Sequence, residues 1–482
     1  MMVRMSLIYL VGRYGASAIT LLALSLYTRL ATPGEYGFFA LVMALSSALY
    51  ACFGQWLRQI LLRFATDTPH GPAPLPSAIL QGFLLSAAVI SACLVLLALI
   101  FGGDLQRAIG AALPLFAAMG LFELGLGWLQ LHLRSGYYVG LSLLRTCTAA
   151  LLGLTFLHLG FGGHGLIIAT FVAYLIAAIP VYWTTRFGMG RAYVTPAAFR
   201  SMLRYGLPIA VSATMGAALA LADRAIIAAL ISTEAAGLYS APYDLAMRTL
   251  QVLMLAINLA GTPLIIRAFE SHDLARTHFF LARQWALLWA TALPMTAIMV
   301  LMPHGIAALL LGPAFREAGG QLMPIVAAAT FLQGLESFYL SLSFALAKRP
   351  MRQMLVLLAA SVVNIGLTYI LVPRYGIMGA GWATLISILL AFGGSLWAGA
   401  SLWPLPFSPV ALARIAAAAT PMMLFLWWAD ARTQLGAIVT GIMALCLYAS
   451  AALFFDVLGF RRQLFTALRA RSVSSRSAGE HS

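Results

Sequence analysis

Long apolar segments separated by short polar breaks make up nearly the whole chain. Each segment holds about twenty predominantly apolar residues, the length that an α-helix needs to cross the hydrocarbon core of a bilayer. No break is long enough for a soluble domain, and the longest, near 185–205, is an amphipathic linker. We therefore expect an all-α membrane protein whose function lies in or beside the membrane. The pattern predicts about 14 transmembrane helices, near residues 14–31, 36–60, 77–101, 108–132, 138–159, 164–184, 206–231, 236–265, 279–303, 320–346, 352–372, 376–400, 409–428 and 433–457.

Composition supports this membrane location. Of the 482 residues, 62% are hydrophobic and 9% are charged, whereas about a quarter of the residues in a soluble domain are charged. The formal net charge of +15 is spread thinly over short loops. It forms no basic stripe with interleaved aromatic side chains, the pattern typical of nucleic-acid binding. We expect membrane lipids, and no nucleic acid, as partners.

The basic residues alternate between the two sides of the predicted membrane. With the N-terminus inside, 20 Lys and Arg residues, Arg58 among them, lie on the cytoplasmic side; 5 lie outside and 4 lie within spans. Because cytoplasmic loops of membrane proteins carry an excess of Lys and Arg, this pattern predicts a multi-pass protein of the bacterial inner membrane. Both the N- and the C-terminus should be cytoplasmic.

Three pairs of short segments in the same order indicate an internal duplication, and two of the pairs have offsets of 213 and 214 residues. Because six spans separate the copies, both have the same topology, which makes the repeat parallel and suits alternating access. The matching pairs are 13–15 with 204–206, 153–157 with 366–370, and 165–170 with 379–384. We expect an N-terminal six-helix lobe at 1–190, a C-terminal six-helix lobe at 191–402, two additional transmembrane helices at 403–460 and a basic, disordered cytoplasmic tail at 461–482.

Three short sequence motifs add to this pattern of spans. Residues 29–37 read RLATPGEYG, Asp223 and Arg224 are adjacent in the seventh span, and residues 237–241 read GLYSA. With the 6+6+2 arrangement of spans, these motifs resemble the O-antigen-type polysaccharide flippases of the multidrug/oligosaccharidyl-lipid/polysaccharide exporter superfamily, over the whole chain except the tail. The resemblance implies that an undecaprenyl-diphosphate-linked oligosaccharide is moved from the inner to the outer leaflet by alternating access. Such transport serves the synthesis of O-antigen lipopolysaccharide, capsule or exopolysaccharide, beside polymerases and glycosyltransferases.

Ionisable residues inside the spans are costly and mark candidate functional sites. Glu123 and Glu336 lie 213 residues apart, the offset of the repeat, so they are expected to be pseudo-symmetry mates near mid-membrane. Each is either a carboxyl group that exchanges a proton during transport or one that is hydrogen-bonded to a neighbouring helix. Arg145 is a candidate contact for a diphosphate, or alternatively an ion-pair partner for Glu123.

A second group flanks the hairpin between the seventh and eighth spans. Asp223 and Asp244 are equally far from the centre of the hairpin; Arg224 follows the first, and Arg248 lies one helical turn after the second. These charges either lock the hairpin or line a cavity, where an Arg could hold a diphosphate or an acidic sugar. The candidate substrate-binding residues are thus Arg145 and these two arginines, and the four carboxylates are candidates for coupling or gating.

Enzyme signatures are absent from the sequence. It contains no phosphate-binding glycine loop with a following Lys and no nucleophile elbow, and the outer loop near 312–320 is too small for a membrane glycosyltransferase. We expect no catalytic residue, metal or cofactor. Two other functions stay open: a cation-coupled multidrug exporter of the same superfamily, and a flippase for the peptidoglycan lipid precursor. The glycan and the coupling ion, whether proton, sodium or none, also stay open.

Overall fold

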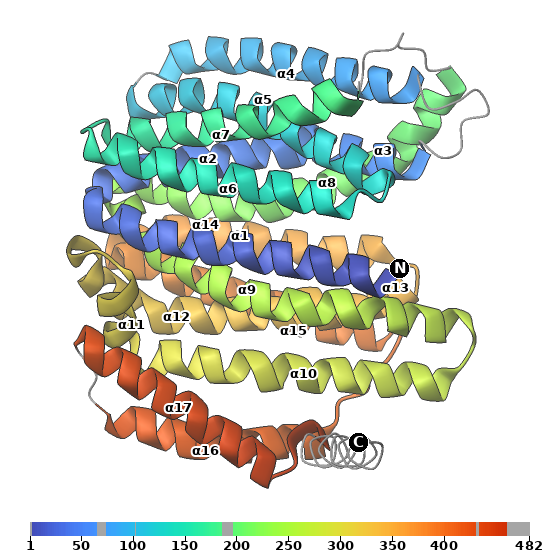
Figure 1. Ribbon diagram of the computed structural model, residues 1–482, viewed down its shortest axis with the longest axis vertical. Coiled ribbons are helices and arrows are strands. Elements are labelled where there is room, and N and C mark those ends of the chain that lie inside the picture. Colours follow the sequence, from blue (N-terminus) through green and yellow to red (C-terminus); the bar gives the residue numbers. More distant parts are fainter. Residues whose placement is uncertain (1, 65–73, 102, 186–195, 430–432, 460–482) are drawn as a thin grey trace, which may run out of the picture. The chain divides into compact units, whose positions relative to one another are not determined.

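The computed structural model describes residues 2–64, 74–101, 103–185, 196–429 and 433–459, and all regular structure in these ranges is helical (Figure 1). The predicted all-α fold is therefore confirmed. The α-helices are α1 (Met2–Leu30), α2 (Pro33–Phe53), α3 (Gln55–Phe64), α4 (Pro74–Phe101), α5 (Gly103–Leu131), α6 (Ser135–His158), α7 (Gly162–Thr185), α8 (Pro196–Leu230), α9 (Thr233–Glu270), α10 (Leu274–Leu301), α11 (Pro303–Leu310), α12 (Arg316–Leu335), α13 (Ser341–Leu346), α14 (Pro350–Tyr375), α15 (Ile377–Ala400), α16 (Pro409–Trp428) and α17 (Gln434–Phe454). Two 3-10 turns, η1 (Pro313–Phe315) and η3 (Val457–Gly459), and a π-helix, η2 (Glu336–Leu340), complete the set.

Twelve segments of the described chain are long and apolar enough to cross a membrane. Helices α1 and α8 are not among them, but at 29 and 35 residues each exceeds the length needed for a core about 30 Å thick. Twelve plus these two gives fourteen, which agrees with the predicted number of spans.

Several element boundaries differ from the sequence prediction. The second span does not end at residue 60, since a break at Gly54 separates α2 from α3, which continues to Phe64. The C-terminal part of the expected linker near 185–205 is the first part of α8, while 186–195 lie outside the described residues. The predicted tail at 461–482 also lies outside the described residues.

The chain forms two compact units. Unit 1 consists of the described residues of Met1–Ala241, Leu311–Phe315 and Leu357–Ala383. Unit 2 consists of those of Pro242–Leu310, Arg316–Val356 and Thr384–Ser482. The lobe boundaries expected from the repeat stay a prediction.

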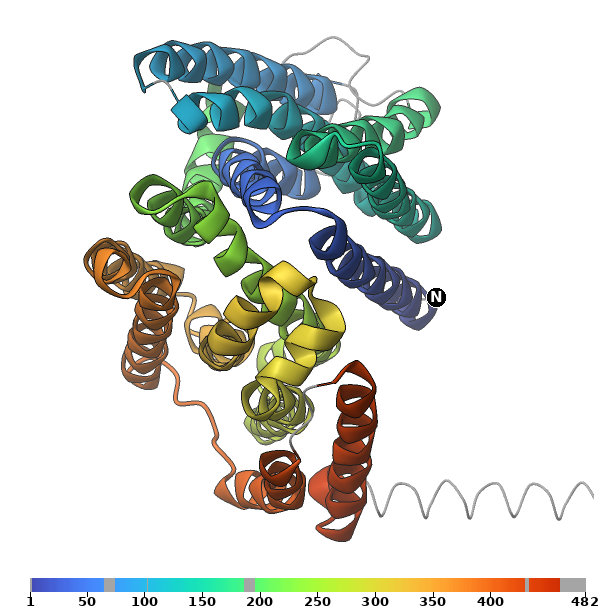
Figure 2. The ribbon, with the colours of Figure 1, turned by 90° about the vertical axis from the view of Figure 1, so that its left-hand side faces the viewer.

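Helix α5 is central to the packing of unit 1 (Figures 1 and 2). One face packs on α3 and α4, where Phe116 meets the ring of Phe83 at 5.6 Å between centroids. Another face packs on α2 and α7 through Phe122 and Val181. A helix that is apolar on most of its circumference is expected at such a buried position.

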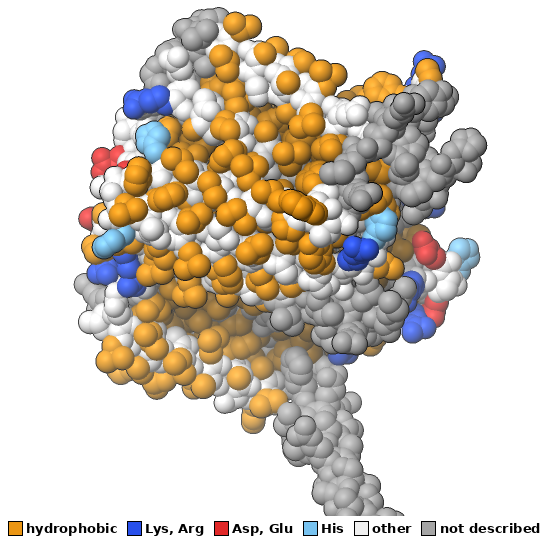
Figure 3. Space-filling model, turned by 45° about the horizontal axis from the view of Figure 1, so that its top comes forward, with side chains coloured by type: hydrophobic (Ala, Val, Ile, Leu, Met, Phe, Trp, Pro, Cys, Tyr) orange, Lys and Arg blue, Asp and Glu red, His pale blue; other side chains and the backbone are white. Residues whose placement is uncertain are grey.

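Hydrophobic side chains cover the middle of the face drawn in Figure 3, and charged side chains lie near its left and right edges. This distribution is the one expected of a surface that faces a bilayer.

Small residues build the contact between α10 and α16 in unit 2. Ala286 and Ala290 of α10 are buried against Ile415 and Ala418 of α16. Side chains this small let two helices approach closely, which is a common way of packing helices in membranes. Tyr448 of α17 adds a polar contact by donating its hydroxyl to the Ala290 carbonyl at 2.7 Å.

The RLATPGEYG motif at 29–37 covers the end of α1 and the start of α2 in unit 1. Thr32 and Glu35 make a capping box at the start of α2: the Thr32 hydroxyl accepts from the Glu35 amide at 3.3 Å, and the Thr32 amide donates to the Glu35 carboxylate at 2.8 Å. This reciprocal arrangement satisfies two backbone donors that the helix itself leaves free. Gly162 and Gly163 approach Glu35 so closely that a Cβ atom at either position would collide with it.

The same motif contacts the start of α9. A Cβ atom on Gly37 would collide with the Thr233 carbonyl, and one on Gly237 would collide with the Pro33 carbonyl. The backbones of α2 and α9 therefore touch directly, and only glycine fits at either position. The motifs at 29–37 and 237–241 thus have a packing role in this fold.

Candidate functional site

The structure distributes the seven predicted site residues over separate polar clusters. Four of them belong to unit 1 and three to unit 2. Those in unit 1 are Glu123 on α5, Arg145 on α6, and Asp223 and Arg224 on α8; those in unit 2 are Asp244 and Arg248 on α9 and Glu336 in η2.

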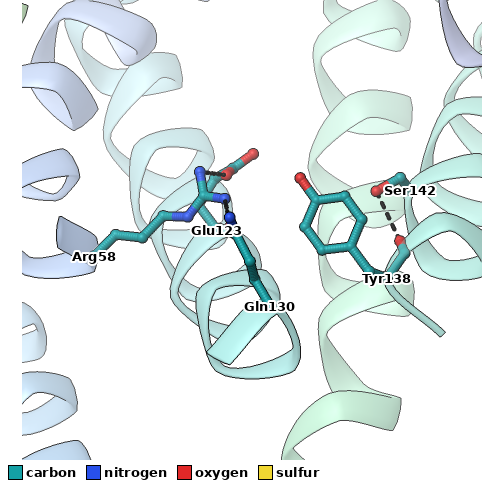
Figure 4. Close-up of polar contacts among 5 residues, drawn as sticks. All are labelled: Arg58, Glu123, Gln130, Tyr138 and Ser142. Atoms are coloured by element: carbon teal, nitrogen blue, oxygen red, sulfur yellow. Dashed lines mark hydrogen bonds and ion pairs between the residues drawn. The ribbon is translucent and has the colours of Figure 1, made fainter. Parts of the chain in front are cut away.

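Glu123 forms an ion pair with Arg58 of α3 (Figure 4). The distance from Arg58 Nη1 to Glu123 Oε2 is 3.1 Å, and Arg58 Nη2 donates to Gln130 Oε1 at 3.0 Å. The two charged side chains are only 20% and 22% exposed. Tyr138 points its hydroxyl towards the pair from α6, and Tyr50 lies beside both charged groups with its own side chain buried.

This pair corrects one expectation. Arg145 was considered as the ion-pair partner of Glu123, but the partner is Arg58. In the structure α3 carries Arg58 near the end of the second predicted span, and its buried residues Leu57 and Leu61 lie on the face that packs within unit 1. Arg58 extends from this helix to Glu123 on α5.

Arg145 instead lies over aromatic rings. Its guanidinium carbon is 5.0 Å from the centroid of Tyr174 and 5.9 Å from that of Phe122. One of its nitrogens donates to Thr146 Oγ1 at 3.0 Å. Aromatic faces attract a guanidinium and fix its plane. Among the described residues, no carboxylate lies within ion-pairing distance of Arg145, so its charge is oriented but not neutralised.

Asp223 lies in a buried polar cluster of unit 1. It is 3% exposed and accepts hydrogen bonds from the Tyr239 hydroxyl at 3.0 Å and from Thr368 Oγ1 at 2.9 Å. Arg224, also buried, donates to the Ala40 carbonyl at 3.3 Å. One turn before Thr368, Asn364 is fully buried, and its amide oxygen and nitrogen have no hydrogen-bond partner in the described part of the chain. The cluster ties α8 to α9, α14 and α2.

The remaining predicted residues lie in unit 2. Asp244 is half-buried and Arg248 is exposed, both on α9. Glu336 is 4% exposed, and its Oε1 atom accepts from Ser395 Oγ at 3.1 Å and from Gln353 Nε2 at 3.3 Å. Its Oε2 atom accepts from Ser337 Oγ at 3.3 Å. Glu123 and Glu336 therefore have different surroundings, although their separation of 213 residues is the offset expected of the repeat.

Breaking the Arg58–Glu123 pair is expected to destabilise unit 1. Glu123→Gln and Arg58→Gln each leave one partly buried charge unpaired, and the coupling free energy between the two changes should be about 1–2 kcal/mol. Equilibrium unfolding of both single variants and the double variant in mixed detergent micelles measures this value. Single effects that add up in the double variant would show that the two side chains are energetically independent.

A model of the family described as polysaccharide biosynthesis protein matches residues 26–319 of the chain. The chain belongs to this family. The resemblance that its motifs show to polysaccharide flippases is thereby confirmed at the level of the family. No curated protein sequence matches the chain.

Solved structures with the same fold are membrane transporters. The lipid II flippase MurJ, in an inward closed conformation, matches with a TM-score of 0.75 at 12% identity over 95% of this chain and 100% of that chain. An inward-facing multidrug resistance transporter of the MATE family matches with a TM-score of 0.62 at 15% identity, over 82% and 98% of the two chains. A MOP superfamily transporter from Pyrococcus furiosus matches with a TM-score of 0.55 at 15% identity, over 83% and 95%. The protein is thus a multi-pass membrane protein with the MOP superfamily fold.

Proposed function

We propose that this protein is a flippase that moves a diphosphate-linked oligosaccharide on a polyprenyl carrier, undecaprenyl by the family resemblance, from the inner to the outer leaflet. Membership of a polysaccharide biosynthesis family and a fold shared with transporters support this proposal. The observation that carries it is Arg145, an intramembrane guanidinium held over two aromatic rings without an acidic partner in the described chain.

The net charge of the candidate site residues in unit 1 favours an anionic substrate. Among the four candidate site residues of unit 1 and Arg58, the charge of Arg58 is balanced by Glu123, and Asp223 has the opposite charge to Arg224. Arg145 leaves a formal charge of +1. An uncompensated charge within a membrane span is costly, and such residues mark substrate pathways. A guanidinium matches the oxygens of a phosphate or carboxylate, whereas it would repel the cationic substrates of a drug exporter.

The proposed transport uses alternating access. Arg145 attracts the diphosphate, or an acidic sugar beside it, while the prenyl chain stays in the lipid. Arg224 and Arg248 are further candidates for contacts to the substrate. We place the protein in the bacterial inner membrane with both termini in the cytoplasm, beside the glycosyltransferases that build the oligosaccharide and the polymerase that uses it.

Complementation tests this function. Expressed in a bacterium that lacks its own O-unit flippase, the protein should restore surface glycan, measured by gel electrophoresis of lipopolysaccharide from strains with equal amounts of protein in the membrane. The two alternative functions are tested in a strain that lacks its lipid II flippase and in a strain that is sensitive to cationic drugs. Rescue of a strain without its lipid II flippase, or resistance to cationic drugs, in the absence of restored glycan would contradict the proposal.

A further inference from the structure

Two arginines on neighbouring helices of unit 2 have exposed side chains. Arg283 lies on α10 and Arg414 lies on α16, and these two helices pack against each other (Figure 1). Arg283 lies one helical turn before Ala286, which is buried in the contact between the helices. Arg414 directly precedes Ile415, which is buried in the same contact. Both guanidinium groups are therefore attached beside one helix–helix contact.

The two arginines also have the same depth in the predicted membrane. Arg283 is the fifth residue of the span predicted at 279–303, and Arg414 is the sixth residue of the span at 409–428. Each lies about 6–8 Å along the helix axis from the start of its span. One turn nearer the start of each helix the surface is apolar, since Phe279 is 57% exposed and Val410 is 62% exposed. The arginines thus lie within the apolar surface, close to its cytoplasmic edge in the proposed topology.

The surrounding helices supply no negative charge. Helices α10, α16 and α17 contain no Asp or Glu. Asp273 precedes α10 and caps it, because its carboxylate accepts from the Arg276 amide at 2.9 Å. Asp456 follows α17, and within the described chain no ion pair joins an acidic residue to Arg283 or Arg414. The anion that neutralises these arginines must therefore come from outside the protein.

A lipid phosphate is the anion available at this depth. A guanidinium forms paired hydrogen bonds with phosphate oxygens. Packed helices are about 8–10 Å apart, so two long arginine side chains beside one contact can reach the same headgroup. Basic pockets between transmembrane helices on the cytoplasmic side bind the headgroups of anionic lipids. The exposed side chains of Phe279 and Val410 offer an apolar surface to the rest of the lipid.

We propose that Arg283 and Arg414 form a binding site for the headgroup of one anionic phospholipid of the cytoplasmic leaflet. The bound lipid joins α10 to α16 and thereby holds the last two helices, α16 and α17, on the rest of unit 2. An acidic protein segment fits this place less well, because the surface beside both guanidinium groups is apolar. The inference goes beyond the proposed flippase function and uses only the proposed orientation in the membrane.

The test measures the binding of defined lipids. Purified full-length protein in detergent is titrated with phosphatidylglycerol, which is anionic, and with phosphatidylethanolamine, which is zwitterionic. Native mass spectrometry gives the dissociation constant of each lipid. The double variant Arg283→Gln/Arg414→Gln is compared with Lys348→Gln/Arg349→Gln, which removes the same charge from two exposed residues before α14 in the same unit.

The wild type should bind one phosphatidylglycerol at least tenfold more tightly than phosphatidylethanolamine. The double variant Arg283→Gln/Arg414→Gln should weaken that binding about tenfold or more, because it removes two charge-assisted contacts. It should also lose the rise in thermal midpoint that phosphatidylglycerol gives the wild type. The variant Lys348→Gln/Arg349→Gln should change the dissociation constant less than about twofold. Arg414→Gln alone should weaken binding by a smaller factor, and it supplies the same comparison if the double variant does not fold.

Three results would overturn the proposal. The first is equal binding of the two lipids by the wild type. The second is an unchanged dissociation constant in the Arg283 and Arg414 variants, or an equal loss in the Lys348 and Arg349 variant. The third is displacement of phosphatidylglycerol by millimolar inorganic phosphate or by a polyglutamate peptide, which would assign the arginines to a free anion or to an acidic protein. Since no readout requires a lipid-linked oligosaccharide, the result is independent of the proposed flippase function.

Discussion

Replacing Gly237 with valine is expected to remove most of the folded protein from the membrane. A Cβ atom at this position would collide with the Pro33 carbonyl, and it would also lie 2.9 Å from the Gly37 amide nitrogen. Both are backbone atoms, so no side chain can rotate away. Forcing extra atoms into a well-packed contact typically costs 1–3 kcal/mol, and here two helix backbones must separate, so we expect more than about 3 kcal/mol. That is a large part of the stability of a typical protein domain.

Gly34→Val is the matched control, because a Cβ atom on Gly34 would meet nothing within 4 Å. Size-exclusion chromatography of detergent extracts gives the fraction of intact protein, and thermal denaturation gives its stability. Gly34→Val should behave as the wild type. Equal yields and equal midpoints for Gly237→Val would refute the direct backbone contact between α2 and α9.

Arg145→Ala is expected to reduce surface glycan at least tenfold in the complementation assay. The loss follows if the guanidinium supplies the charge that holds the diphosphate, since a charge-assisted hydrogen bond contributes about 1.5–3 kcal/mol. Arg145→Lys should recover part of the activity, because a lysine keeps the charge but lacks the planar fork that matches phosphate oxygens.

The control lies immediately before the same helix. Arg134 precedes α6, has an exposed side chain and makes no side-chain capping bond, so Arg134→Ala should leave the glycan unchanged. Membrane levels and thermal midpoints are measured for every variant. A normal amount of glycan with Arg145→Ala, or a loss that parallels a fall in its midpoint, would assign Arg145 to the packing of Tyr174 and Phe122.

The sequence predicted the helical fold and nearly every span, because a bilayer demands apolar runs of about twenty residues and leaves few other solutions. It did not predict the partner of Glu123. Arg58 lies close to the end of an apolar run, and its ion pair depends on the break at Gly54 and on the course of α3. A basic residue beside Leu57 and Leu61 in an amphipathic segment was the available signal.

The surroundings of the two glutamates were harder to predict. The repeat offset relates the positions of Glu123 and Glu336, but it says nothing about their partners. One meets Arg58 and the other meets Ser395, and both partners come from helices distant in the sequence. The π-turn at Glu336 has no sequence signature, since it is held by contacts with Gln284 and Pro406, which lie 54 and 67 residues away from their partners.

The most direct measurement of the central claim is movement of a polyprenyl-diphosphate-linked oligosaccharide across liposomes that contain only the purified protein. The substrate is incorporated into the inner leaflet, and its appearance outside is followed by cleavage with an added glycosidase. The proposed function predicts that the cleaved fraction rises with time and with the amount of protein, and that Arg145→Ala slows this rise. A cleaved fraction no greater than that of protein-free liposomes, with correctly folded protein present, would contradict it.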